Sequence, residues 1–219
     1  SMPEEDFLSP GEFVDSDHPL VIEYAEAHVG SGKTDMEKVL SLFYAIRDGI
    51  RYDPYLPMGD PKSYRASDTV KLGRGWCVPK SALLTSCCRI FGIPARPGYA
   101  DVINHLSTAR LMELTGTQRF YWHSYTEVLL EGKWVKCTPA FNKSLCDKFG
   151  LKPLDFDGRT DSLFHEFDVA GNRHMEYVLD RGYRADVPFE EIAACFREHY
   201  SQAWSDGVDG DFQAEAAAS

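Results

Sequence analysis

Residues 73–92 read GRGWCVPKSALLTSCCRIFG and contain the clearest helix signals in the chain. Pro79 suits the first turn of a helix, where the N–H that proline lacks would have no partner. Gly92 suits the position just after the last turn, and a proline two residues later prevents the helix from continuing. We therefore predict a helix over residues 78–92 that begins directly after Cys77.

Cys77 falls at the cap or first position of this predicted helix. The unpaired N–H groups and the positive dipole end of a helix N-terminus lower the pKa of a thiol. Lys80 adds a positive charge one turn later, and Gly73 and Gly75 allow the chain to turn sharply. Cys77 is therefore a candidate nucleophile, and the alternative is that it packs the core like the other small residues of the helix.

A cysteine nucleophile also needs a base, usually a histidine that is close in space but distant in sequence. His123 is the best placed of the seven histidines, because it lies within FYWHSYTEV (120–128), a run typical of a β-strand. The alternative is a histidine satisfied within the core or at a sheet edge. The other histidines fall in predicted loops or on predicted surfaces.

Hydrophobic periodicity predicts the remaining elements. We expect helices over 17–30, 34–50, 68–72 and 188–204, a strand over 93–102, and an antiparallel hairpin over 119–141 that turns at Glu131-Gly132-Lys133. Residues 51–64 predict a loop that crosses the surface. Residues 142–182 indicate a short helix and an extended wrap. Residues 205–219 predict a disordered tail after a single domain over 1–204.

The composition bounds the classes of function. Lys and Arg total 23 and Asp and Glu total 34, which gives a net charge of −11. This balance argues against binding to nucleic acid or to an anionic membrane. No run of about 18 apolar residues predicts a membrane span, and the acidic start lacks the features of a signal peptide. Six cysteines do not make a disulfide scaffold in 219 residues, so we expect free thiols in the cytoplasm.

Several spaced motifs resemble those of the transglutaminase-like superfamily, in the order that the family has them. Residues 74–101, RGWCVPKSALLTSCCRIFGIPARPGYAD, resemble its cysteine motif, and residues 122–139, WHSYTEVLLEGKWVKCTP, resemble its histidine motif. The segments AIRDGIRYDPY (45–55) and ASDTVKLGRGWC (66–77) resemble the family's approach to the cysteine. The resemblance extends over residues 36–141.

The resemblance implies an α+β, papain-like fold, in which the cysteine-bearing helix packs on an antiparallel sheet that holds the histidine. It assigns the nucleophile to Cys77 and the general base to His123, in a core over 34–141 with a family-specific extension over 142–204. It implies attack on the carbonyl of a peptide or small-molecule amide through a thioester, without cofactor or metal. We favour a peptidase or amidase over a transferase, since the sequence shows no sign of the calcium sites of large crosslinking enzymes.

One position departs from the family motif. Where the family usually has an aspartate that orients the imidazole, this chain has Thr138, which can only accept a neutral hydrogen bond. In one interpretation the site is still catalytic, because cysteine needs less activation than serine and neutral third members work in cysteine enzymes. Thr138, or Asn142 four residues later, would then hold His123. In the other interpretation, the site has lost turnover and only binds.

A thioacyl reaction also needs donors for the developing oxyanion, and the backbone N–H of Cys77 is a natural one. Trp76 is a tentative second donor through its indole N–H, although a packing role is equally compatible with the sequence. His165 and Asn142 are further tentative residues for substrate or oxyanion. His165 belongs to the segment 153–177, which we expect to wrap the domain and roof the cleft, anchored by Phe156, Phe164 and Phe167.

Two rival functions remain open at this stage. The first is a non-catalytic binding or scaffold domain that keeps the transglutaminase-like groove. The second is redox sensing by Cys77 and Cys87, but ten residues along one helix separate these thiols by about 15 Å.

Overall fold

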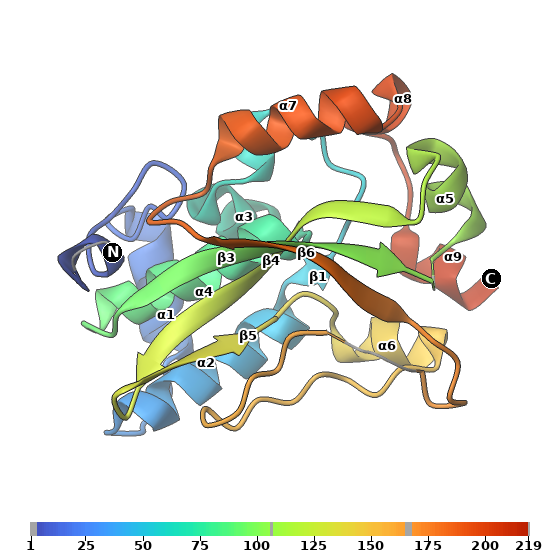
Figure 1. The fold of residues 1–219 in the computed structure, drawn as a ribbon. Helices are drawn as coiled ribbons and strands as arrows, with labels where there is room; N and C mark the ends of the chain where they lie inside the picture. The colour runs from blue at the N-terminus through green and yellow to red at the C-terminus, as the bar shows by residue number, and fades with distance from the viewer. Residues whose placement is uncertain (1–3, 106, 165–167, 219) are drawn as a thin grey trace.

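The computed structural model describes residues 4–105, 107–164 and 168–218. Its centre is an antiparallel sheet in the strand order β5-β4-β3-β6, with one helix lying on the sheet and three more packed around that helix (Figure 1). The strands are β3 Ala95–Asn104, β4 Arg119–Leu130, β5 Lys133–Cys137 and β6 Met175–Tyr183. The four helices are α1 Pro19–His28, α2 Asp35–Gly49, α3 Ala66–Leu72 and α4 Cys77–Ile90. The expected α+β arrangement is confirmed.

The helix predicted over residues 78–92 is α4, and it lies at the centre of the fold. Its residues from Cys77 to Arg89 are all buried, which explains why its sequence is rich in small and apolar residues. Thr126 of β4 donates a hydrogen bond to the carbonyl of Ser81, with 2.9 Å between the two oxygens. Gly92 has a φ of 72°, as a left-handed helix stop requires. The helix therefore begins and ends where the local signals indicate.

The predicted hairpin is the pair β4 and β5. Glu131 and Gly132 join the strands with φ values of 51° and 76°, which is the pattern of a two-residue turn that matches the twist of antiparallel strands. The other edge strand, β6, was not predicted. Its residues from Tyr177 to Asp180 are all exposed. A strand is recognised in a sequence when residues suited to burial alternate with residues suited to exposure, and β6 lacks that alternation.

Lys80 connects the start of α4 to two neighbouring segments. Its ammonium group is completely buried and donates to the carbonyls of Arg47 at 3.0 Å, Ile50 at 2.5 Å and Ala140 at 2.8 Å. Burial lowers the pKa of Lys80 to about 7. Lys80, the basic residue one turn after Cys77, therefore links the end of α2 and the segment after β5 to α4 through these hydrogen bonds.

The prediction that residues 51–64 cross the surface is wrong. Arg51–Tyr52 forms the short strand β1, which pairs in parallel with β2, Arg74–Gly75. Residues 52–56 are all buried, because later parts of the chain cover them. Trp204 contributes to that cover and donates from its indole N–H to the carbonyl of Pro54 at 3.0 Å.

The segments after β5 form most of this cover. Their helices are α6 Lys143–Phe149, α7 Phe189–His199, α8 Gln202–Ser205 and α9 Phe212–Ala218. Earlier in the chain, α5 Ala109–Thr115 lies between β3 and β4, and two 3-10 turns lie at Glu4–Phe7 and Pro61–Ser63. The tail expected to be disordered instead includes α9, because Phe212 gives it an apolar anchor that is 5% exposed. Among the described residues, every helix is too short or too polar to span a lipid bilayer.

The extension between α6 and β6 follows an extended path, as the sequence indicates. Ser162 pairs with Cys137 at the end of β5, and Asp155 forms an ion pair with Arg47 at 3.1 Å. Phe156 is buried beside Phe43. Phe164 lies 5.7 Å from Tyr177 between ring centres. The remaining predicted anchor, Phe167, is outside the described residues.

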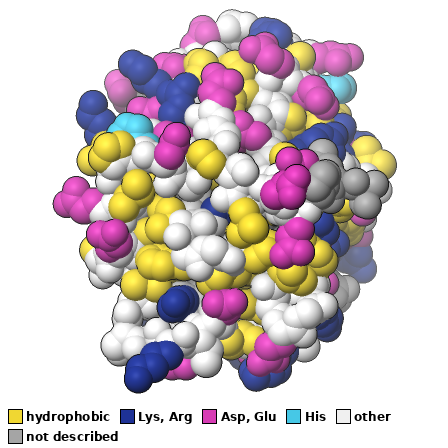
Figure 2. All heavy atoms as spheres, turned by 90° about the vertical axis from the view of Figure 1, so that its left-hand side faces the viewer, with side chains coloured by type: hydrophobic (Ala, Val, Ile, Leu, Met, Phe, Trp, Pro, Cys, Tyr) yellow, Lys and Arg dark blue, Asp and Glu magenta, His cyan; other side chains and the backbone are white. Residues whose placement is uncertain are grey.

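The surface carries mixed charges. Figure 2 shows the side of the molecule at the left of Figure 1, where acidic, basic and apolar side chains are interspersed. On this face the basic side chains do not gather into a single field of the kind that binds nucleic acid.

Candidate active site

Cys77 is the first residue of α4 and is 1% exposed. Burial raises the pKa of its thiol to about 12, while hydrogen bonds from the backbone N–H groups of Ser124, Val78 and Cys77 itself act in the opposite direction. The helix N-terminus therefore stabilises the thiolate as the sequence predicts, but desolvation is the larger effect. The pKa of this thiol is therefore raised, contrary to the expectation of a lowered pKa.

His123 lies on β4 and is 6% exposed. Its neighbour Ser124 is the strand residue whose N–H approaches the Cys77 sulfur. The packing of α4 on β4 therefore sets Cys77 against the strand that bears His123, although 46 positions separate 77 from 123 in the sequence.

A bulge in the sheet precedes His123. The register between β3 and β4 shifts between Ala100 and Val102, and Trp122 has a φ of 60°, a left-handed value that non-glycine residues rarely adopt. Bulges re-aim the side chains beside them. The orientation of His123 therefore depends on whatever holds the backbone of Trp122.

Asp101 holds that backbone and was missed by sequence reasoning. It is completely buried and accepts a hydrogen bond from the Trp122 N–H at 3.0 Å. Its carboxylate also binds Arg119 at 2.9 Å and Arg181 at 2.6 Å. Burial alone would raise the pKa of Asp101, but these hydrogen bonds lower it below its usual value. The one sequence signal for this role of Asp101 is that an acidic residue stands in a predicted strand of mostly apolar residues.

Thr138 follows β5 and is 2% exposed. Its backbone N–H donates to the carbonyl of Ser162 at 2.9 Å, and its hydroxyl donates to the carbonyl of Leu163 at 2.5 Å. A hydroxyl has one proton and two lone pairs. Since the proton is given to Leu163, the oxygen of Thr138 is left as an acceptor, which is the role that a neutral third member would require.

Asn142 connects β1, α6 and α9. Its side-chain oxygen accepts from the backbone N–H of Tyr52 at 3.1 Å, and its amide donates to Ser144 at 2.8 Å and Gln213 at 3.0 Å. Both amide protons are thereby used, and the oxygen keeps a second lone pair. That Asn142 holds the imidazole stays a prediction.

Trp76 is a core residue in this structure. Its indole N–H donates to the carbonyl of Ser63 at 2.8 Å, and the ring is completely buried between Tyr64 and Phe196. Of the two alternatives for Trp76, packing is therefore the one that the structure supports. The N-terminus of α4 has no side-chain cap, so the first-turn N–H groups are the oxyanion donors nearest to Cys77. The tentative residue His165 is outside the described residues.

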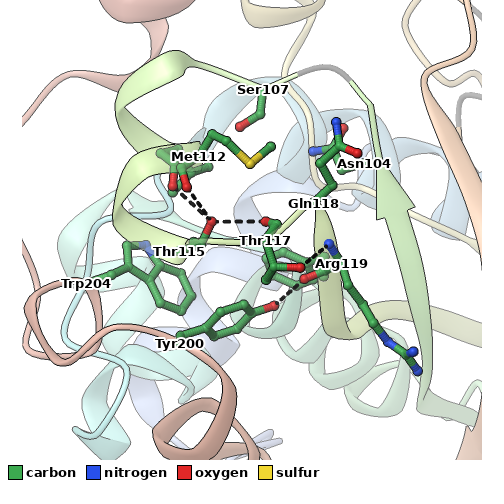
Figure 3. A pocket seen from close by; sticks show the side chains of 11 residues that line it. Asn104, Ser107, Met112, Thr115, Thr117, Gln118, Arg119, Tyr200 and Trp204 are labelled. Atoms are coloured by element: carbon green, nitrogen blue, oxygen red, sulfur yellow. Dashed lines mark hydrogen bonds between the residues drawn. The ribbon is translucent and has the colours of Figure 1, made fainter.

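A hollow that Phe120 helps to line lies between α5, the start of β4 and α8. Figure 3 shows its lining, with the Tyr200 hydroxyl donating to the carbonyl of Arg119. Phe120 forms another wall and lies 6.3 Å from the ring of His123. The cavity volume is about 20 Å³, room for one water molecule. In the closed structure this hollow does not admit a substrate.

The described residues offer no group of three His, Cys, Asp or Glu side chains that could hold a metal ion. All six cysteines are free thiols.

A solved structure from Cytophaga hutchinsonii, provisionally identified as a cysteine protease, is similar to this chain with 19% identity and a TM-score of 0.49. The alignment covers 82% of this chain and 46% of that one, so the chain spans less than half the length of that protein. No match was found among the curated protein sequences.

The family comparison covers the elements that form the site. The model of the transglutaminase-like superfamily matches residues 22–139, a region that runs from α1 to the end of the hairpin and includes Cys77, His123 and Thr138. Since this match takes in more than half of the chain, the protein belongs to the transglutaminase-like superfamily.

Proposed function

We propose that the protein is a cysteine-nucleophile acyl-transfer enzyme that acts on an amide or a related carbonyl through a thioester. The observation that carries the proposal is the packing of α4 on β4. Cys77 is the first residue of that helix, and His123 belongs to that strand.

The reaction follows from the groups at this place. His123 accepts the proton of the Cys77 thiol as the sulfur attacks the carbonyl carbon. The oxyanion that forms faces the uncapped first turn of α4, where backbone N–H groups can stabilise it. The carbon–nitrogen bond then breaks, and the imidazolium gives its proton to the departing amine. The product of this half-reaction is an acyl group on Cys77.

The raised pKa of Cys77 determines when the proton moves. With a thiol pKa of about 12, the resting nucleophile is a neutral thiol. Proton transfer is then coupled to attack, as general-base catalysis requires. Thr138 accepts a hydrogen bond from the imidazole in this scheme and stabilises the imidazolium less than an aspartate would.

We favour hydrolysis of the thioester over transfer to an amine. Hydrolysis needs only water as the second reactant, whereas transfer needs a second site that holds an amine. We further propose that the protein acts in the cytoplasm, where its six free thiols would stay reduced. The substrate is a peptide or a small-molecule amide.

A second candidate function is a binding domain without turnover. Two observations favour it: Cys77 is 1% exposed, and Thr138 provides no negative charge to stabilise an imidazolium. A binding domain would keep the groove but would not form a covalent adduct with a substrate.

One experiment separates these candidates. The wild type and the Cys77→Ala variant are incubated with a panel of amides and peptides, with and without an added primary amine, and intact masses are recorded after rapid acid quench. An acyl adduct on the wild type alone, together with product release, supports the enzyme. The added amine in the product identifies a transferase. Binding of a panel member without adduct or product in either protein would overturn the proposal.

A further inference from the structure

The segment after α8 is docked on the molecule by an apolar contact at its centre. The ring of Phe212 packs against three aromatic rings, at centre distances of 5.7 Å to Tyr52, 5.9 Å to Tyr55 and 5.7 Å to Phe149. Phe212 is 5% exposed and Ala216, one turn later, is 2% exposed. The chain itself therefore occupies an aromatic slot.

Polar contacts hold both sides of this slot. Glu215 accepts hydrogen bonds from Arg110, at 2.8 Å, and from the hydroxyl of Tyr55. Arg110 also donates to the carbonyl of Asp209 at 2.6 Å. The side-chain oxygen of Gln213 accepts from Asn142 at 3.0 Å and from Ser144 at 3.1 Å. The slot thus accepts an aromatic ring, a carboxylate and an amide oxygen from one short stretch of peptide.

The slot is next to Cys77. Tyr52, on which Phe212 packs, pairs with Gly75 in the two-stranded sheet, and Cys77 begins α4 two residues after Gly75. Burial raises the pKa of Tyr52 well above its usual value, and the charge of a Cys77 thiolate adds to that rise. The Tyr52 hydroxyl and the sulfur are therefore within electrostatic reach of each other, and Tyr52 is the partition between the slot and the sulfur.

Open hollows flank the docked segment. One, of about 400 Å³, is lined by Arg51, Tyr55 and Arg74 together with residues 206–210 of the tail. The other, of about 570 Å³, is lined by His105, Arg110 and Met112 together with Glu215. The tail forms part of the wall of both, so moving it aside would join the two hollows in one groove that passes over Tyr55.

We propose that the groove under residues 208–216 is the substrate-binding groove of Cys77, and that it takes a peptide segment carrying an aromatic side chain followed by a carboxylate. The chain's own tail occupies this groove in the closed protein and is displaced by substrate. This inference rests on the proposed function, because the groove matters to catalysis only if Cys77 reacts.

Few contacts hold the docked segment. Among its residues whose burial is described, Phe212 and Ala216 are the buried apolar ones and Val208 is partly buried, and the ion pair with Arg110 is partly exposed, with the arginine side chain 42% accessible. Exposed ion pairs of this kind contribute little. Segments with few buried apolar contacts open at a small cost in free energy.

The test uses the full chain and the reactivity of Cys77 towards iodoacetamide. Phe212→Asp places a carboxylate in the aromatic slot, and Ala214→Asp adds the same charge two residues later at an exposed position. Arg110→Gln removes the polar anchor without removing a core side chain. Circular dichroism and thermal unfolding establish that each variant is folded, and peptide mapping gives the rate at which Cys77 is alkylated.

We expect alkylation of Cys77 to be about tenfold faster in Phe212→Asp than in the wild type or in Ala214→Asp, with Arg110→Gln in between. A synthetic peptide of residues 206–217, added to Phe212→Asp, should slow the alkylation again, and the same peptide with Phe212→Asp should not. Equal rates in all four folded proteins, or no protection by the peptide, would overturn the groove assignment.

These outcomes are independent of the proposed chemistry. If Phe212→Asp exposes Cys77 but no amide acylates it, the groove stands and the enzyme proposal fails. If the wild type and Phe212→Asp form acyl adducts at the same rate and Cys77 is alkylated equally in both, the enzyme proposal stands and the groove assignment fails.

Discussion

The backbone N–H of Trp122 donates a hydrogen bond of 3.0 Å to the buried carboxylate of Asp101. Trp122 has a φ of 60° at this point, and a conformation of this kind persists only where its surroundings hold it. His123 is the next residue. The orientation of the candidate base is therefore coupled to a carboxylate on the neighbouring strand, which Arg119 and Arg181 hold in place.

Asp101→Asn should disturb both stability and the site. Removing one partner from a buried charge pair costs about 3–5 kcal/mol, because Arg119 and Arg181 lose their counter-charge. We expect a fall in the free energy of unfolding of that order, measured by urea denaturation. Asp180→Asn on the exposed part of β6 is the matched control and should change stability by less than about 0.5 kcal/mol. Similar effects of the two changes would contradict this role of Asp101.

Lys80 should make stability depend on pH in a defined direction. Burial lowers its pKa from 10.5 to about 7 in the folded protein, so between these values the unfolded chain binds a proton that the folded chain does not. The free energy of unfolding therefore rises with pH in this window, by about 1 kcal/mol per pH unit. This gain in the free energy of unfolding is lost as the pH falls towards 7.

Lys80→Met should remove this dependence. Denaturant unfolding of the wild type and the variant from pH 7 to 8.5 measures it. The cysteines begin to titrate in the unfolded chain at the upper end of this range, but both proteins share them, so their effect cancels in the difference. The difference in stability between the two proteins should widen steadily with pH in favour of the wild type. A constant difference would mean that Lys80 keeps its usual pKa.

Thr138 should contribute to activity through its oxygen. Thr138→Val removes the acceptor for the imidazole and also the hydrogen bond to Leu163, which costs about 1 kcal/mol of stability. We expect kcat to fall at least about tenfold while Thr138→Ser retains it. Thr138→Asp should not raise kcat, because its carboxylate would oppose the carbonyl of Leu163. A gain of activity in Thr138→Asp would show that threonine is an impaired third member.

Cys77 should react slowly with iodoacetamide in the resting wild type. Its pKa of about 12 leaves little thiolate at pH 7, so we expect Cys195, the one cysteine that is not buried, to be alkylated first. The rate at Cys77 should rise about tenfold per pH unit between pH 7 and 10. Faster alkylation of Cys77 than of Cys195 at pH 6 would reveal a preformed thiolate and imidazolium pair.

The parts of the fold that could be predicted from sequence have local signals. Pro79 and Gly92 mark the ends of α4, and the turn at Glu131 and Gly132 marks the hairpin. The meeting of Cys77 and His123 rests on the family motifs, because nothing local to either residue indicates which strand packs on which helix.

The parts that could not be predicted depend on contacts between distant segments. Tyr52 is buried because Phe212 packs on it, 160 positions later in the chain, and Phe212 is a single aromatic residue in an acidic tail. The pKa of Cys77 depends on how deeply it is buried, which its position at a helix end does not reveal. The hydrogen bonds of Asn142 to Tyr52 and Gln213 likewise join segments that are distant in the sequence, so no local signal indicates them.

The central claim is that Cys77 is a nucleophile whose base is His123. The direct measurement is the rate at which an activated aryl ester acylates Cys77, followed by intact-mass spectrometry and peptide mapping in the wild type, His123→Ala and Cys77→Ala. We predict an acyl adduct on Cys77 in the wild type, formation slower by about 10²-fold or more in His123→Ala, and no adduct in Cys77→Ala. Acylation at the same rate in the wild type and His123→Ala, or an adduct on another residue, would contradict the account.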